Sequence, residues 1–217
     1  MSDKVFYLRE IGVVTPVSLV RSRAEHISEA QASASQINNL NEMAEQVMQC
    51  QQCNLASTRQ HVRFGYGNEH AELLLVSSPP NAEEDKQDES YVGETGQLFD
   101  AMLMSIGMNR ELIYNLHIVQ CAPPHHRDPK PEELHACRIW LDKQIDCVKP
   151  KVMVVVGRIA AQALLESDDG LDALRQKWHH YRSMPVLVLL HPAYLLRSPK
   201  QKQKAWDDLL LLQQKLH

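Results

Sequence analysis

The sequence predicts an α/β fold, in which a central parallel sheet is covered on both faces by helices. Four short apolar runs rich in Val, Leu and Ile have the length and composition of buried parallel strands. Segments with helical periodicity separate these runs, and this alternation is typical of a three-layer sandwich. With 217 residues and 44% hydrophobic content, the chain can bury one substantial core, whereas a second full domain would be cramped.

The predicted strands also indicate where a site should lie. They are Leu73–Val76, Ile113–Val119, Val152–Val156 and Val186–Leu190. Parallel sheets bind their ligands beyond the carboxyl ends of the strands. We therefore expect functional residues in the loops after Val76, Val119 and Leu190.

Helices are predicted before, between and after these strands. The first starts at Asn39, because apolar residues recur at helical spacing through Val47. The next runs over residues 98–106 and ends at Gly107, where a glycine can close a helix. The others cover residues 131–148, with proline in the first turn, residues 158–165 and residues 203–216.

Residues 1–37 have a different character from the predicted domain of residues 38–217. Phe6, Leu8, Ile11 and Val14 give this segment one apolar face, and the small polar residues 27–36 resemble a flexible linker. We interpret residues 1–37 as a tethered, partner-binding peptide. The alternative is that the segment packs on the domain as an additional helix.

Charge and hydropathy limit the classes of partner and location. The formal net charge of −4 excludes a uniformly basic protein that coats phosphate, so any DNA contact should be local. No run of 18 apolar residues occurs, and the first residues lack the order of a signal peptide. We expect a cytoplasmic protein.

Four of the five cysteines have a spacing that suggests a metal centre. Cys50 and Cys53 form a Cys-x-x-Cys pair, Cys121 follows a predicted strand, and Cys137 lies in the helix that comes next. Zinc is the chemical alternative to an iron–sulfur cluster at four thiolates, although two Cys-x-x-Cys pairs are more usual for zinc. We interpret Cys147 as a small buried apolar residue.

Several motifs give the sequence a specific resemblance from Cys50 to about Trp206. These are Cys50-Gln-Gln-Cys53-Asn-Leu, Phe64-Gly-Tyr-Gly-Asn68, Tyr91-Val-Gly-Glu-Thr-Gly-Gln-Leu98, Gln120-Cys-Ala-Pro-Pro-His-His-Arg-Asp128, Glu132-Glu-Leu-His-Ala-Cys137 and His191-Pro-Ala-Tyr-Leu-Leu-Arg197. In this order they resemble the family 4, iron–sulfur uracil-DNA glycosylases. The resemblance implies the uracil-DNA glycosylase-like three-layer sandwich and a structural 4Fe-4S cluster on Cys50, Cys53, Cys121 and Cys137.

The sequence departs from that family in the base pocket. Ser78 stands where the family has a water-positioning glutamate, and a serine cannot act as a general base at neutral pH. Asn81 replaces a glycine that approaches the base, and Tyr91 replaces a stacking phenylalanine. His117 replaces the base-reading asparagine, whose adjacent donor and acceptor an imidazole cannot reproduce. A buried core histidine is the alternative interpretation of His117.

The motif from His191 to Arg197 resembles the family at its functional positions. The resemblance implies that His191 stabilises the departing uracil anion and that Leu195, Leu196 and Arg197 belong to the loop that wedges into DNA. If the chain is an enzyme, the catalytic candidates are therefore Ser78, His117 and His191. Otherwise, this motif is retained for the fold or for DNA contact.

The altered pocket favours a non-catalytic subunit. The N-terminal segment from Phe6 to Val13 resembles the psi subunit of bacterial DNA polymerase III, whose peptide binds the clamp-loader collar and whose domain binds the chi subunit. We therefore expect a psi-like accessory subunit that bridges the collar to chi. The alternative is an active or altered-specificity family 4 uracil-DNA glycosylase in base excision repair; an electron-transfer protein has only the cysteines in its favour.

Overall fold

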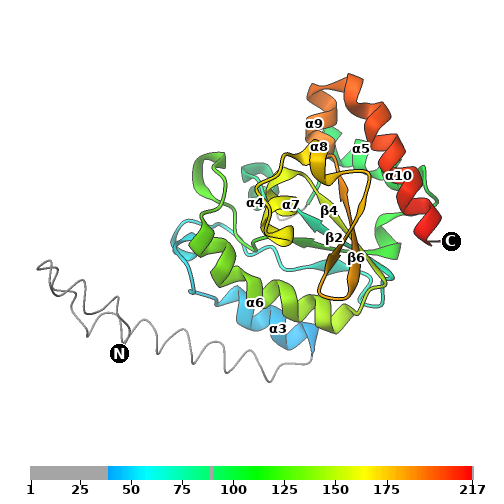
Figure 1. The fold of residues 1–217 in the computed structure, drawn as a ribbon. Helices are drawn as coiled ribbons and strands as arrows, with labels where there is room; N and C mark the ends of the chain where they lie inside the picture. The colour runs from blue at the N-terminus through cyan, green and yellow to red at the C-terminus, as the bar shows by residue number, and fades with distance from the viewer. Residues whose placement is uncertain (1–38, 88–89, 217) are drawn as a thin grey trace, which may run out of the picture. The chain divides into compact units, whose positions relative to one another are not determined.

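The computed structural model describes residues 39–87 and 90–216, and within them it confirms the predicted α/β class. Six strands form one sheet in the order β1-β3-β2-β4-β6-β5 (Figure 1). The strands are β1 (Tyr66–Gly67), β2 (Leu73–Ser77), β3 (Ile113–His117), β4 (Val152–Val156), β5 (Trp178–Tyr181) and β6 (Met184–Leu189). The four central strands are parallel, as expected, whereas β1 and β5 pair antiparallel at the two edges.

Helices cover the sheet on both faces. The α-helices are α3 (Leu40–Met48), α4 (Ala82–Gln87), α5 (Gly93–Met104), α6 (Pro131–Val148), α7 (Arg158–Leu165), α8 (Leu171–Leu174), α9 (Pro192–Arg197) and α10 (Lys202–Leu216). Short 3-10 turns are η1 (Asn54–Ser57), η2 (Arg110–Leu112), η3 (Pro124–His126) and η4 (Pro199–Gln201). Helix α5 begins five residues before the predicted start at Leu98, and β3 ends at His117 rather than at Val119.

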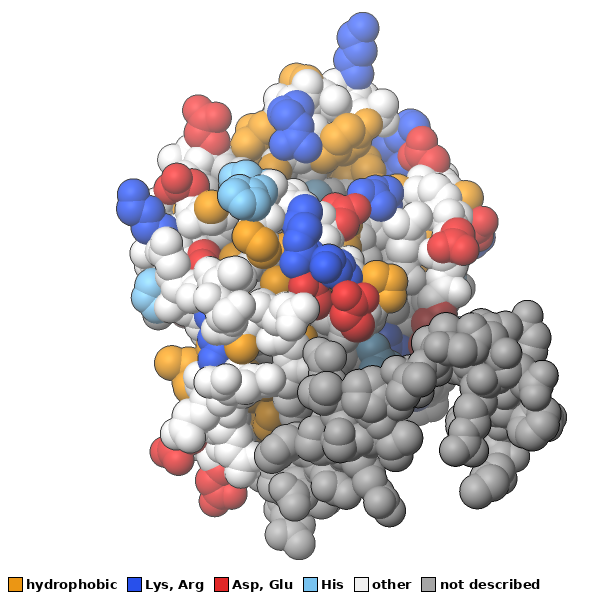
Figure 2. Space-filling view, turned by 90° about the vertical axis from the view of Figure 1, so that its left-hand side faces the viewer, with side chains coloured by type: hydrophobic (Ala, Val, Ile, Leu, Met, Phe, Trp, Pro, Cys, Tyr) orange, Lys and Arg blue, Asp and Glu red, His pale blue; other side chains and the backbone are white. Residues whose placement is uncertain are grey.

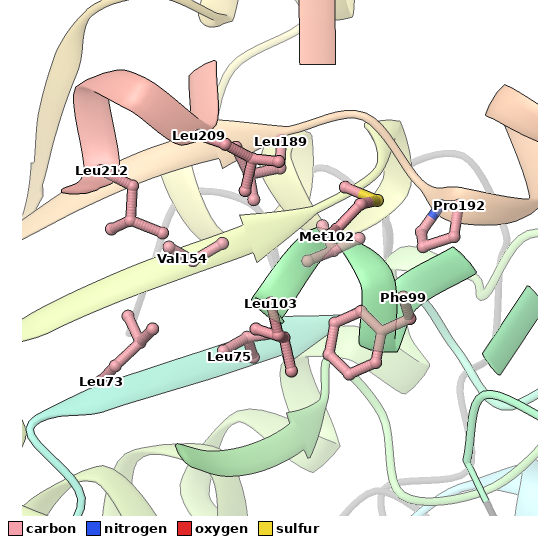
Figure 3. Close-up of a pocket in the computed structure, with 11 residues that line it drawn as sticks. Leu73, Leu75, Phe99, Met102, Leu103, Val154, Leu189, Pro192, Leu209 and Leu212 are labelled. Carbon is pink, nitrogen blue, oxygen red and sulfur yellow. The ribbon is translucent and has the colours of Figure 1, made fainter. Parts of the chain in front are cut away.

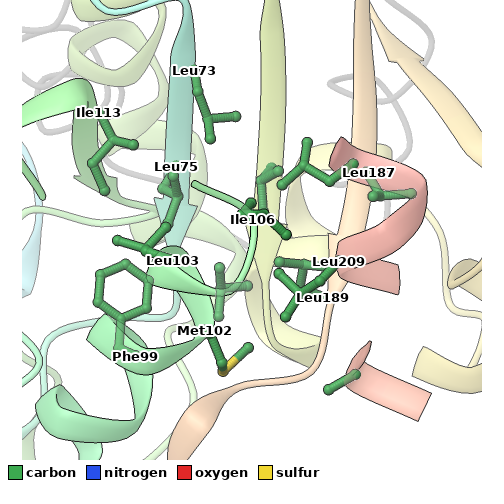
Figure 4. Packing of buried hydrophobic residues seen from close by; sticks show 14 of the residues in the cluster. Leu73, Leu75, Phe99, Met102, Leu103, Ile106, Ile113, Leu187, Leu189 and Leu209 are labelled. Carbon is green, nitrogen blue, oxygen red and sulfur yellow. The ribbon is translucent and has the colours of Figure 1, made fainter. Parts of the chain in front are cut away.

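Successive side chains of a strand point to opposite faces of the sheet. Alternate residues of each central strand therefore pack against the helices on one face or on the other. Leu73, Leu75 and Val154 pack on one face against α5 and α10, through residues such as Phe99 and Leu209 (Figure 4). Helices α6 and α7 contact β3 and β4. Every residue of β2, β3 and β4 is buried, which is why β2 and β4 read as nearly continuous apolar runs, whereas β3 also buries the polar side chains of Asn115 and His117.

A small apolar pocket lies within the core between α5, α10 and the sheet (Figure 3). Its volume is about 10 Å³, and its walls include Leu75, Met102 and Leu212. Such a volume holds about one water molecule, and the walls offer nothing that would bind it. We interpret this pocket as a packing gap rather than a ligand site.

Candidate functional site

A large cavity opens where three parallel strands end. Its volume is about 720 Å³, and its walls come from the loops after β2, β4 and β6. This is the edge of the sheet at which the sequence predicted a site. The residues that matter for its chemistry are Ser78, Asn81, Glu84, Gly157, His191 and Arg197.

The three strand ends meet closely at Ser78, Gly157 and His191. The Ser78 hydroxyl donates a hydrogen bond to the Val156 carbonyl over 3.1 Å. A Cβ atom on Gly157 would lie 2.7 Å from Ser78 Oγ and 3.4 Å from His191 Cβ, and the glycine φ is +91°. Only glycine combines this backbone conformation with this approach. Gly157 therefore allows the serine and the histidine to share one wall of the cavity.

His191 is held as a neutral hydrogen-bond donor. It is the N-cap of α9, where its Nδ1 atom accepts a hydrogen bond from the Ala193 amide over 3.2 Å. The ring proton of the neutral form must then be on Nε2. Burial lowers the pKa of His191 to about 4, against the opposing effect of the nearby Glu84 carboxylate. At neutral pH, a neutral N–H group is therefore available at the cavity wall.

Glu84 is a cavity residue that sequence reasoning missed. Its carboxylate oxygens accept hydrogen bonds from the amides of Tyr91 (2.7 Å) and Asn81 (2.9 Å). The Asn81 side chain in turn accepts hydrogen bonds from the amides of Glu83 and Glu84. Asn81 and Glu84 thus form a capping box at the start of α4, and the spacing Asn-x-x-Glu is the signal that could have revealed it.

Tyr91 is buried in the core and is not among the residues that line the cavity. Its side chain is only 2% exposed, and its ring stacks on Phe99 with 4.0 Å between centroids. The Tyr91 hydroxyl is 2.6 Å from Ser77 Oγ, and burial raises the pKa of the phenol well above its usual range. The ring is thereby fixed in the core, 5.7 Å from the ring of His191.

His117 is also turned away from the cavity. Its Nδ1 atom is 2.6 Å from the Ser78 carbonyl oxygen, which can only accept, so Nδ1 is the donor. Its Nε2 atom then accepts from Ser90 Oγ over 2.8 Å, and Ser90 accepts from Arg63 over 3.2 Å. Burial lowers the pKa of His117, so the neutral ring is maintained. Both ring nitrogens are used inside the protein, and neither is free to contact a base.

The predicted wedge residues occupy different environments on α9. Leu195 is 1% exposed and packs in the core, so it is not free to enter a DNA duplex. Leu196 is half-buried, while Arg197 is exposed and lines the cavity. Insertion into DNA thus stays a prediction for Leu196 and Arg197. The assignment of Leu195 to the wedge is corrected, because Leu195 is a core residue.

The four cysteines of the predicted metal centre surround a second, smaller cavity. Cys50 follows α3, Cys53 precedes η1, Cys121 follows β3, and Cys137 lies in α6. Cys147 is not among the residues that line this cavity. Within the described part of the chain, no three His, Cys, Asp or Glu side chains are placed to hold a single metal ion. The four thiols are nevertheless brought to one place from separate elements.

The surroundings of these thiols fit a sulfur-ligated group. The Gln120 amide donates to Cys137 Sγ over 3.3 Å, and Arg59 Nη1 lies 3.5 Å from Cys121 Sγ. Trp140 Nε1 also lines this region, is buried and has no hydrogen-bond partner among the described residues. Burial raises the pKa of the Cys121 thiol to about 11, which argues against a reactive cysteine nucleophile. Thiolates and N–H donors of this kind suit an iron–sulfur cluster.

Two further sequence predictions concern the chain outside the cavities. The proposed partner-binding residues Phe6, Leu8, Ile11 and Val14 lie outside the described residues. Among the described helices, none is long and apolar enough to cross a membrane. On the face shown in Figure 2, basic and acidic side chains lie side by side rather than forming one broad basic surface.

Comparison with known proteins identifies the family. Residues 64–210 match the model of the uracil DNA glycosylase superfamily. The type-4 uracil-DNA glycosylase of Archaeoglobus fulgidus is 32% identical over 180 residues, covering 79% of this chain and 90% of the relative. That of Thermotoga maritima is 35% identical over 164 residues, covering 72% and 82%. The type-5 uracil-DNA glycosylase of Thermus thermophilus is 29% identical over 149 residues, covering 62% and 66%.

These relatives correct the functional prediction from sequence. The expectation of a non-catalytic psi-like subunit, with the clamp-loader collar and the chi subunit as partners, is wrong. It depended on a resemblance of about fifteen residues, from Phe6 to Val13 and on to Leu19, whereas the similarity to named glycosylases covers about four fifths of the chain. The departures expected at Ser78 and His117 were the other ground for that prediction, and they do not outweigh this similarity. The chain belongs to the uracil DNA glycosylase superfamily.

Proposed function

We propose that this protein is a DNA glycosylase that removes uracil from DNA in base excision repair. The observation that carries the proposal is the cavity at the carboxyl ends of β2, β4 and β6, with the neutral N–H of His191 at its wall. Relatives that are 28–35% identical are named type-4 uracil-DNA glycosylases, which supports the same reaction. The substrate would be a nucleotide turned out of the DNA stack into the cavity.

The residues of the cavity suit hydrolysis of an N-glycosidic bond. As this bond breaks, negative charge develops on the departing base, and the His191 Nε2–H group can stabilise it. Positive charge develops on the sugar, and the buried carboxylate of Glu84 provides a negative potential at the same cavity. Ser78 can hold a water molecule but cannot deprotonate it at neutral pH. We therefore expect slower excision than an enzyme with a carboxylate at that position would give.

Base selectivity should differ from that of an enzyme with a base-reading amide. Both ring nitrogens of His117 are occupied by Ser78 and Ser90, so this position contributes no contact to a base. The Asn81 side chain lines the cavity and is exposed, although its oxygen already caps α4. An altered specificity is thus the second candidate, and it calls for assays with several deaminated bases.

We further propose that Cys50, Cys53, Cys121 and Cys137 hold a 4Fe-4S cluster. The four thiols, the amide donor at Cys137 and the unpartnered Trp140 Nε1 support this assignment over a reactive thiol site. When bound, such a cluster would cross-link the segments that carry its ligands. It lies outside the base cavity, and the residues of that cavity do not include any of its ligands.

The first test is direct excision of the base. The wild-type protein should release uracil from a uracil-containing oligonucleotide, and His191→Ala should reduce the rate on the order of a hundred-fold, because one donor to the leaving base is lost. Single-turnover cleavage of the resulting abasic site gives both rates. His180→Ala, at an exposed histidine of β5, is the matched control. No release of any deaminated base, even with enzyme in large excess, would refute the proposal.

The pH dependence provides a second test of His191. Its pKa is lowered to about 4 in the folded protein, so the neutral donor persists at neutral pH and is lost as the pH falls towards 4. Protonation of Nδ1 would also remove the acceptor that caps α9 at Ala193. We expect protonation of His191 to have no effect on the excision rate between pH 6 and 9, and the rate to decline below about pH 5. A decline centred near pH 6.5, absent from His191→Gln, would contradict this assignment.

A further inference from the structure

A short segment connects the cysteine cavity to helix α4, whose residue Glu84 lines the base cavity. It consists of Arg59, Gln60 and His61, which follow the η1 turn that starts after Cys53. Its two ends contact different sites, and the contacts are specific hydrogen bonds rather than apolar packing.

The cysteine end is formed by the guanidinium of Arg59. Nη1 donates to the Cys50 carbonyl over 2.8 Å and lies 3.5 Å from Cys121 Sγ. Nη2 donates to the Met48 carbonyl over 3.0 Å, at the end of α3. One side chain thus contacts two of the four cysteines, Cys50 and Cys121, and the end of the helix that precedes Cys50. Such a planar fork of donors holds its partners in a defined geometry.

The other end is bound by Asp85 on α4, the neighbour in sequence of the cavity residue Glu84. Its carboxylate accepts hydrogen bonds from the amides of Gln60 (3.1 Å) and His61 (2.9 Å). The His61 ring also contacts the Asp85 carbonyl through Nδ1. Asp85 is buried, with 6% of its surface exposed. These contacts join α4 to the segment that carries Arg59.

Helix α4 depends on such bonds because it has little apolar attachment. Its buried side chains are two carboxylates, Glu84 and Asp85, and its other residues face solvent. Glu84 in turn fixes the amides of Asn81 and Tyr91 at the cavity. Elements with few buried apolar contacts open locally at low free-energy cost. The position of this cavity wall is therefore set largely by hydrogen bonds.

A second connection runs in the same direction. The Arg63 amide donates to the Gln120 carbonyl over 2.6 Å, and the Gln120 amide donates to Cys137 Sγ. The Arg63 side chain donates to Ser90, the residue before Tyr91. Residues 59–63 are thus hydrogen-bonded to the surroundings of the cysteines, to Asp85 on α4 and to Ser90.

We propose that Arg59–His61 is a strut through which an intact cysteine site positions the Asn81–Glu84 wall of the base cavity. Arg59 and Asp85 are its two positioning residues. The strut makes the shape of the base cavity depend on the state of the cysteines, although the two cavities share no lining residue. This inference rests on the proposed function in taking the larger cavity as the base site and the cysteines as ligands.

Hydrogen–deuterium exchange of the full chain tests the strut without substrate. Arg59→Met and Asp85→Asn should each speed exchange at the Asn81 and Tyr91 amides about tenfold, the effect of losing roughly one hydrogen bond. The double variant should exchange no faster than the faster single variant, because both changes break the same connection. Cys121→Ser should also speed exchange at these two amides, but it lowers the overall stability as well, so the strut is judged on Arg59→Met and Asp85→Asn. Lys86→Met, at an exposed position of α4, is the control and should match the wild type.

Two results would overturn the strut. One is exchange at Asn81 and Tyr91 that stays at the wild-type rate in Arg59→Met. The other is acceleration that extends equally to Val154 in the central strand β4, which would indicate global destabilisation. If Asp85→Asn fails to fold, Arg59→Lys replaces it and should give an intermediate effect, since lysine keeps the charge but not the fork. Because the readout needs no excision, it is independent of failure of the glycosylase proposal.

Discussion

Replacing Cys121 by serine is expected to give a colourless protein with a markedly lower melting temperature. The wild-type protein, purified without oxygen, should be brown, with visible absorbance from iron–sulfur charge transfer. Cys121 lies four residues after the end of β3 and is 7% exposed, so a serine there leaves a cluster one ligand short in a buried position. Loss of a structural metal group is among the few changes that cost more than about 4 kcal/mol. For a chain of this size, that corresponds to a fall in Tm of roughly 10 °C.

Cys147→Ser is the matched control for this prediction. Cys147 is a half-buried cysteine of α6 and does not line the cysteine cavity. The control should keep both the colour and the iron content, measured by absorbance and by metal analysis. A colourless wild-type protein with one equivalent of zinc would contradict the cluster assignment. An unchanged spectrum in Cys121→Ser would exclude Cys121 as a ligand.

The central sheet was predictable because its strands are buried on both faces. Each reads as a short run of Val, Leu and Ile, and no other arrangement of such runs between helices buries them as well. The edge strands were not predictable in the same way. Strand β1 has two residues, and β5 carries the half-exposed or exposed residues Trp178, His179 and His180. Such edges are set by tertiary pairing rather than by composition.

The candidate site was predictable in its location but not in its details. Strand ends and the resemblance placed Ser78 and His191 near a cavity. The resemblance also placed His117 and Tyr91 at the base, yet Ser90 and Ser77 hold their side chains within the protein. A sequence pattern indicates which residue occupies a strand end, but the partner of its side chain depends on distant segments. For the same reason Leu195, which reads as part of a loop, is a core residue.

Placing a carboxylate at the end of β2 is expected to accelerate base excision strongly. In Ser78→Glu, a general base would stand where the wild type has only a hydroxyl, and general-base catalysis typically contributes on the order of a hundred- to ten-thousand-fold in rate. The cavity of about 720 Å³ has room for the longer side chain. The change removes the hydrogen bond from Ser78 to Val156, a cost of about 1 kcal/mol that a folded domain should tolerate.

Ser78→Gln separates this effect from a change of shape, because glutamine has the same length without the basic carboxylate. Single-turnover rates at pH 7 should rise in Ser78→Glu alone. The new charge would lie beside His191, the neighbour of Ser78 across Gly157, and should raise the histidine pKa from about 4. The acidic limb of the pH–rate profile should then move to higher pH. If that limb moves while the rate does not rise, the carboxylate reaches the cavity but activation of water does not limit the reaction. The slow step must then be entry or recognition of the base. His117 offers no free hydrogen-bonding atom for that recognition.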